Sequence, residues 1–187
     1  SAMDVTGNYA PKLLDAAGGD IRLLGISSNP AVPSAVANGL VGDAHAAVIK
    51  AQALAAQYRT AHQPISTFID GRGFSGTPGD LTDYSAGDND SVSMLIGAAG
   101  LNDKHSAMGL LLGAQSRLPV QRKISRKRNG SVGLTNAYFT DGTSIDKQQG
   151  KFSALAAKNY IHFRKHPNVP GYYFSISSTL AQGDFST

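Results

Sequence analysis

A glycine-rich segment is the first candidate for chemistry in this sequence. Gly71, Gly73 and Gly76 follow the pattern Gly-x-Gly-x-x-Gly directly after an apolar run that predicts a β-strand. In dinucleotide-binding folds such a segment turns from a strand into a helix, whose N-terminus binds the pyrophosphate. Here Thr77 and Pro78 follow and no helical period begins. We therefore favour a crossing loop over a cofactor site.

Serine, histidine and aspartate occur throughout the sequence, but their spacing matches neither a catalytic triad nor a metal site. The chain contains no Gly-x-Ser-x-Gly or His-Glu-x-x-His motif and no glutamate at all. Asp88-Asn89-Asp90 has the start of a calcium loop but not its later Gly and Glu. The histidines are scattered, and we expect structural positions for them: His45, His62, His105, His162 and His166. The sequence thus predicts a non-enzymatic protein without a cofactor or a metal.

The densest charge is a run of cations, which we call the basic segment: Arg122, Lys123, Arg126, Lys127 and Arg128. Residues 1–103 hold ten Asp against five Lys or Arg, whereas residues 104–187 hold twelve Lys or Arg against three Asp. Opposite patches of this kind can bring one copy of a protein onto the next. The segment can also bind phosphates, although no aromatic residue lies between Leu118 and Leu134 to stack on bases. A solvated loop, a protein contact and a nucleic-acid contact all stay open.

Length and composition indicate one globular domain. A chain of 187 residues with 41 % apolar and 16 % charged residues is typical of a folded protein that buries roughly 70 % of its unfolded surface. It has no cysteine, and its longest apolar stretch, Met94–Leu101, is shorter than the roughly 20 residues of a membrane span. Ser1 and Ala2 precede Met3 like a cleavage scar. We expect residues 1–3 to be such a scar and residues 4–187 to be one domain excised from a longer protein.

The pattern of apolar residues predicts a βαβ unit in the first half of the chain. Ile21–Ile26 and Ile65–Ile69 are apolar runs that predict buried strands. Between them apolar residues recur at helical spacing from Gly42, with Asp43 as the N-cap, to His62 in the last turn. The two strands should be parallel and joined by a right-handed connection.

A second long helix is expected from Asn102 or Asp103 to Arg117, and its Gly109 and Gly113 would let its backbone approach a sheet. The other expected elements are a loop over residues 71–90, a strand at Val92–Ile96, a helix from about Gly150 to Lys158, and strands at Tyr160–Phe163 and Gly171–Ile176. Residues 120–149 show no clear element. This alternation predicts a three-layer α/β domain, with helices on both faces of a mostly parallel mixed sheet.

Several strings in the sequence resemble the contractile-tail sheath proteins of phages and related injection machines. They are HSAMGLLLG at 105–113, LPVQRKISR at 118–126, YIHFR at 160–164, GYYF at 171–174, TL at 179–180 and DF at 184–185. More narrowly, roughly residues 20–187 resemble a prophage branch of these proteins that is catalogued as a domain of unknown function.

The resemblance implies a structural subunit whose copies stack as rings around a tail tube and contract by sliding past one another. It also implies a fold similar to subtilisin without the catalytic residues, and terminal arms that lend strands to neighbouring subunits. No such arm is evident in this sequence, so we expect the isolated chain to be a monomer. The implied partners are other sheath subunits and the tail tube protein, without a membrane or a specific nucleic acid. The implied location is a virion tail that is assembled in the bacterial cytoplasm.

Our hypothesis from the sequence is therefore a central domain of a contractile tail sheath, with the basic segment in contacts between subunits. Exposed ion pairs contribute only about 0 to 1 kcal/mol each, so these charges would set register more than strength. One alternative is a nucleic-acid-binding module that uses the cations from Arg117 to Arg128, and another is a nucleotide-dependent enzyme that uses the loop at residues 71–76. Salt-dependent retardation of DNA or RNA would indicate the first, and stabilisation by dinucleotides the second.

Reversing two charges of the basic segment, as in Arg122→Glu combined with Lys123→Glu, should impair sheath polymerisation by the full-length protein. Like charges would then meet across the contact, while the monomer should stay folded because the segment is polar. Electron microscopy of the particles and circular dichroism of the monomer test this expectation. Normal sheaths from the double variant would remove the basic segment from the subunit contact.

Overall fold

Helices and short strands alternate along the computed structural model, which describes residues 5, 9–27, 35–87, 90–101, 106–118, 124–125, 131–176 and 179–181. The α-helices of these ranges are α1 Ala10–Ala16, α2 Gly42–Thr60, α3 Met108–Ser116 and α4 Phe152–Ala157. The strands are β1 Leu23–Ile26, β2 Val36–Ala37, β3 Leu40–Val41, β4 Ser66–Asp70, β5 Val92–Leu95, β6 Phe163–His166 and β7 Val169–Phe174. Short 3-10 helices are η1 Pro78–Asp80, η3 Ile145–Lys147 and η4 Gln149–Lys151.

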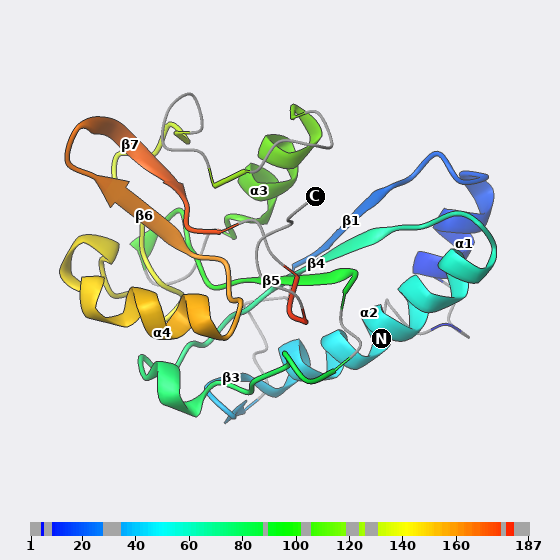
Figure 1. Ribbon diagram of the computed structural model, residues 1–187, viewed down its shortest axis with the longest axis horizontal. Coiled ribbons are helices and arrows are strands. Elements are labelled where there is room, and N and C mark those ends of the chain that lie inside the picture. Colours follow the sequence, from blue (N-terminus) through cyan, green and yellow to red (C-terminus); the bar gives the residue numbers. More distant parts are fainter. Residues whose placement is uncertain are drawn as a thin grey trace.

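Three strands form a parallel sheet in the order β1–β4–β5 (Figure 1). Leu23 of β1 lies opposite Ser66 of β4, and Thr67 of β4 lies opposite Val92 of β5. Every residue of β4 after Ser66 is buried, as is all of β5. Continuous apolar runs favour this arrangement, because a central parallel strand is covered on both faces. The predicted strands and their parallel pairing are confirmed.

Two helices cover this sheet. α2 contacts β4 and β5, whereas α3 contacts β1 and β4; in Figure 1, α2 runs below the strands and α3 lies above them. α1 is joined to the C-terminal end of α2 by Tyr58, whose hydroxyl donates to Pro11 O at 3.0 Å and also to Asp15. None of the helices in the described ranges has both the length and the apolar character needed to cross a membrane.

The start of α2 differs from the prediction that Asp43 is its N-cap. The helix begins at Gly42, and the N-cap residue is Val41, which has an extended backbone and no capping side chain. The Gly42 amide donates instead to Ala35 O at 3.0 Å. The short β2–β3 hairpin leads straight into the helix, so its backbone replaces the side-chain cap. Asp43 lies in the first turn, where a carboxylate still interacts favourably with the helix dipole.

α3 begins later than the expected cap at Asn102 or Asp103, two residues that lie outside the described ranges. Its first residue is Met108, whose amide donates to Ser106 Oγ at 3.1 Å. The helix is therefore nine residues long. Its N-cap residue is Ala107, which makes no capping side-chain bond, and the Ser106 hydroxyl accepts from the first helical amide instead.

The close approach between α3 and the sheet is made by a glycine of the sheet. Among the described residues, a Cβ atom added to Gly109 or Gly113 would meet no atom within 4 Å, so the prediction that these two glycines face the sheet is wrong. A Cβ added to Gly25 in β1 would instead lie 2.5 Å from Leu112 Cδ1 and 3.1 Å from Met108 Cγ. The absence of a side chain at Gly25 therefore allows α3 to pack on β1.

The C-terminal strands form an antiparallel hairpin rather than further strands of a parallel sheet. β6 and β7 pair antiparallel, with Phe163 opposite Phe174. Both strands differ from their predicted bounds at Tyr160–Phe163 and Gly171–Ile176. Ile161 lies before the hairpin and pairs in parallel with Leu95 of β5 instead. The sheet structure is therefore mixed, and Ile161 links its two parts.

Residues 131–149, which showed no clear pattern, contribute to the core. Ala137 and Phe139 are fully buried, and Tyr138 exchanges backbone hydrogen bonds of 2.9 and 3.1 Å with Ala98. Val132 donates to Tyr172 O at 2.7 Å. This segment folds through pairing with distant parts of the chain, so local periodicity could not reveal it.

The loop expected over residues 71–90 is confirmed in its described part and is held by Lys158. The Lys158 ammonium donates to the carbonyl oxygens of Pro78, Gly79 and Leu81 at 3.1, 3.1 and 2.5 Å. The Tyr160 hydroxyl donates to Thr82 O at 2.8 Å. The segment between α4 and β6 thus fixes a loop that lies far away in sequence.

Substituting two glycines should have opposite effects on stability. Gly25→Ala should lower the free energy of unfolding by about 1 to 3 kcal/mol, because Leu112 must move. Gly109→Ala should raise it by up to about 1 kcal/mol, because this helical position has open space and alanine favours a helix. Urea denaturation of both variants tests the pair; equal effects would contradict the packing of α3 on β1.

Candidate functional site

The carboxyl ends of parallel strands are the usual place for ligand sites in α/β folds, and a buried ion pair lies there. Asp70 ends β4, and its Oδ2 accepts hydrogen bonds from Arg72 Nε at 2.9 Å and from Ser27 Oγ, after β1, at 3.0 Å. The Asp70 and Arg72 side chains are both buried. Asp70 Oδ1 is also buried and has no hydrogen-bond partner among the described residues. The carboxylate is thus neutralised by a neighbouring cation, which suits a structural role.

The glycine-rich segment after Asp70 uses its amides within the protein. Gly71 N donates to a β5 carbonyl at 2.8 Å, Phe74 N to Thr140 Oγ1 at 3.3 Å, and Ser75 N to Gly39 O at 2.9 Å. Thr140 Oγ1 in turn donates to Gly71 O at 2.7 Å. The segment continues into η1, which is three residues long and not an α-helix. These three amides are therefore engaged, and the helix N-terminus that binds a pyrophosphate in dinucleotide folds does not follow.

One histidine lies in the core and another bonds a loop. The His162 ring stacks on Phe152 with 5.0 Å between ring centroids, and its Nδ1 lies 3.0 Å from Ser175 Oγ. His45 in α2 bonds the Tyr84 hydroxyl at 2.5 Å. His62 directly follows α2, His105 lies outside the described ranges, and the side chain of His166 is likewise not described. Where side chains are described, no three His or Asp groups come together as a metal site.

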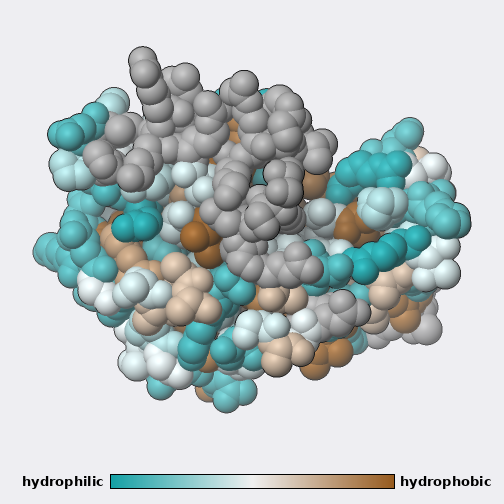
Figure 2. Space-filling model, in the orientation of Figure 1, coloured by the Kyte–Doolittle hydropathy of each residue, from teal (hydrophilic) through white to brown (hydrophobic). Residues whose placement is uncertain are grey.

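The helix α2 has a buried apolar face and, among exposed polar residues such as Asp43 and Gln57, a second row of apolar side chains. Its inner face buries Ala44, Val48, Ala51, Leu54, Ala55 and Tyr58 in the core. Its outward face, which we call the outer stripe, exposes Ala46, Ile49, Ala53 and Ala56 at helical spacings of three, four and three residues. The Ile49 side chain is 68 % exposed. In Figure 2, apolar residues gather along the lower edge of the molecule, over α2.

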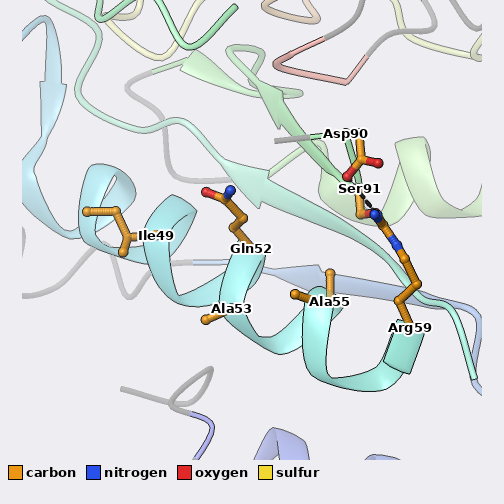
Figure 3. A pocket seen from close by; sticks show the side chains of 8 residues that line it. Ile49, Gln52, Ala53, Ala55, Arg59, Asp90 and Ser91 are labelled. Atoms are coloured by element: carbon orange, nitrogen blue, oxygen red, sulfur yellow. Dashed lines mark hydrogen bonds and ion pairs between the residues drawn. The ribbon is translucent and has the colours of Figure 1, made fainter. Parts of the chain in front are cut away.

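A groove of about 270 Å³ borders the outer stripe (Figure 3). Its lining residues come from α2 and from the segment before β5: Ile49, Gln52, Ala53, Ala55, Ala56, Arg59, Asp90 and Ser91. Arg59 closes one end, because its Nη2 donates to Asp90 Oδ1 and to Ser91 Oγ, both at 2.6 Å. The hydrogen bond from Arg59 lowers the pKa of the Asp90 carboxyl below its usual value.

The chemistry of this groove suits contact rather than catalysis. Three alanines and one isoleucine form its apolar part, Gln52 and Ser91 add polar groups, and its charged groups, Arg59 and Asp90, are paired with each other. A concave apolar surface with a polar rim is typical of a site for a partner's side chain. The sequence interpretation missed it, although the spacing of Ala46, Ile49, Ala53 and Ala56 repeats the helical period on the opposite face of α2.

The predicted contact residues of the basic segment lie outside the described residues: Arg122, Lys123, Arg126, Lys127 and Arg128. Ile124, between them in sequence, is buried in the core. Arg117 is exposed, and its Nε donates to Gly113 O at 3.1 Å at the end of α3. The contact role of the basic segment stays a prediction.

Acid should destabilise the fold through His162. Burial lowers the pKa of this histidine from 6.5 to about 4, so the unfolded chain binds a proton more readily than the folded one. The free energy of unfolding should therefore fall by about 3 kcal/mol from this group as the pH falls from about 6.5 to about 4. Denaturation of the wild type and of His162→Gln across this range tests it. An unchanged pH dependence in the variant would show that His162 does not titrate as its burial requires.

Comparison with known protein families places the chain in a recognised family. The model of a family described as DUF2586, N-terminal domain, matches residues 29–178, which include α2, α3, strands β4 and β5 and the β6–β7 hairpin but not β1. No characterised protein in a search of curated sequences matches the chain. Because the family match spans most of the sequence, the chain belongs to the DUF2586 family.

Proposed function

We propose that this chain is part of a structural subunit of a contractile tail sheath, which polymerises around a tail tube and then contracts. The outer stripe of α2 carries the proposal. Apolar side chains gathered on an exposed face mark an interaction surface, and Ala46, Ile49, Ala53 and Ala56 face solvent in the single chain. A protein that assembles with copies of itself covers such a face.

The composition of the outer stripe suits close packing between subunits. Alanine at three of the four positions lets the backbone of a neighbour approach closely, while Ile49 supplies the large side chain. Full burial of an isoleucine contributes roughly 1.5 to 3 kcal/mol. One such contact is weak, but it is repeated at every subunit of a helical array.

The resemblance to sheath proteins supports a common fold. Most of the described residues in its strings are core residues, such as Met108, Leu111, Tyr160, Tyr172 and Phe174. Strings of this kind are therefore packing motifs. In this proposal α2 and α3 form the outer layers of a three-layer domain, and the sheet between them is the central layer.

The proposed partners follow from this role. They are neighbouring sheath subunits and the tail tube protein, in a virion tail that is assembled in the bacterial cytoplasm. The subunit is non-enzymatic, and the basic segment steers one subunit onto the acidic surface of the next. The outer stripe then supplies affinity, which exposed ion pairs alone do not provide.

A charge within the outer stripe should block assembly. Ala53→Glu in the full-length protein, produced together with the tube protein, should raise the concentration needed for polymerisation at least about tenfold, because an unpaired charge would be buried in the contact. Gln149→Glu is the matched control, since it adds the same charge at an exposed position in η4, outside α2. Sedimentation and electron microscopy measure assembly, and thermal melts confirm that both variants fold. Equal assembly of the two variants would remove the stripe from the contact and with it the main support for the proposal.

A further inference from the structure

The short helix α1 carries a second exposed apolar face. Its inner residues Ala10, Pro11 and Leu14 are buried, whereas Tyr9 and Leu13 are 72 % and 53 % exposed. Tyr9 immediately precedes the helix and Leu13 follows four residues later, so the two side chains lie on the same side of it. We call this side the outer face of α1.

Contacts with the rest of the domain hold α1 in place. Its Leu14 side chain belongs to the core. The Tyr58 hydroxyl of α2 donates to Pro11 O at 3.0 Å and also bonds Asp15. A helix this short is marginal in water on its own, so these contacts set its position. Tyr9 and Leu13 are therefore presented on a fixed element.

Tyr9 and Leu13 differ from the other exposed large apolar side chains of the described ranges. Val36 stands on β2 and Leu101 follows β5, each as a single residue, while Ile49 belongs to the outer stripe. Two large side chains on one face bury more apolar area in a contact than one does. The outer face of α1 is thus the part of a second copy best suited to an apolar groove.

The groove beside the outer stripe has the size and chemistry to receive these side chains. Its volume of about 270 Å³ is below the roughly 300 to 1,000 Å³ of sites for small-molecule ligands. Ala53 and Ala56 are small and lie beside Ile49, so large side chains of another helix can pack between them. The Gln52 amide also lines the groove and suits a tyrosine hydroxyl, which usually forms a hydrogen bond when it is buried.

We propose that the outer face of α1 packs into the groove beside the outer stripe of a second copy, with Tyr9 and Leu13 as the inserted side chains. The inference rests on the proposed function and names the part of the neighbour that covers the stripe. The same chain's α1 does not fill the groove, because the lining residues come from α2 and the segment before β5. Tyr9 and Leu13 are exposed in that chain.

The proposed contact joins two different surfaces, so it can repeat from copy to copy. A copy whose α1 is bound by one neighbour still offers its groove to the next, and such contacts build open arrays. Packing of the outer stripe on the same stripe across a two-fold axis would instead use both stripes and stop at two copies. The contact between α1 and the groove is therefore the one that suits a sheath.

Engineered cysteines test the contact directly, because the chain has none of its own. A disulfide requires two Cα atoms within about 7 Å. Leu13→Cys is combined with Ala53→Cys or with Ala56→Cys in the full-length protein, produced together with the tube protein and mildly oxidised. At least one double variant should show dimers, trimers and longer cross-linked chains on a non-reducing gel. Each single variant should remain a monomer on the same gel.

A charge on the outer face of α1 should weaken assembly. Leu13→Asp should raise the concentration needed for polymerisation at least about tenfold, because the charge would enter an apolar contact. Leu101→Asp is the matched control, since Leu101 is exposed to a similar extent, 58 % against 53 %, and lies outside α1. Thermal melts confirm that both variants fold. Equal assembly of the two variants would contradict the proposed contact.

The possible results separate the two proposals. Particles that form without cross-links in either double variant would overturn the α1 contact and leave the sheath proposal intact. Cross-linked dimers of Ala53→Cys alone would replace the contact by pairing of stripe with stripe. A protein that cross-links through α1 and α2 but never forms particles would keep the contact and overturn the sheath proposal. A protein that does neither would overturn both.

Discussion

Pairing of β4 with a parallel strand on each side is the constraint on which the rest of the structure depends. A buried central strand needs a partner for each backbone group and an apolar cover on each face. β1 and β5 supply the partners, and α2 and α3 supply the cover. The carboxyl end of the strand is closed by the ion pair of Asp70 and Arg72 and by the Thr140 hydroxyl, which bonds Gly71. The carboxyl ends of parallel strands bind ligands in many α/β folds. In this protein the carboxyl end of β4 forms bonds with other parts of the chain instead.

The same arrangement leaves two apolar surfaces exposed in the described part of the single chain. One is the outer stripe of α2, whose inner face already packs on the sheet. The other is the outer face of α1, whose inner residues are buried. They differ in shape, since the stripe borders a groove whereas Tyr9 and Leu13 stand exposed on a short helix. Two dissimilar surfaces on one domain are what an open array requires, because each contact joins different faces of neighbouring copies.

Much of the fold could be predicted from the sequence, because buried parallel strands have continuous apolar sequences. Ile21–Ile26 and Ile65–Ile69 predicted β1 and β4 to within three residues, and α2 followed from its inner face. The packing side of α3 could not be predicted from its glycines, because a sequence shows that Gly109 has no side chain but not which side of the helix packs on the sheet. The outer stripe was not predicted, because its apolar residues repeat with the same helical period as the inner face of α2. The sequence pattern therefore shows a helix in either case and does not show that a second apolar row is exposed. Residues 131–149 fold through long-range pairing, which local patterns do not encode.

The central claim is that this domain acts by binding copies of itself through dissimilar surfaces. Electron cryomicroscopy of the full-length protein produced with its tube protein tests that claim most directly. The account predicts a helical array in which density from a neighbouring copy covers Ile49 and the rest of the outer stripe on α2. An array in which the outer stripe faces solvent, or a full-length protein that stays monomeric beside its tube protein, would contradict it.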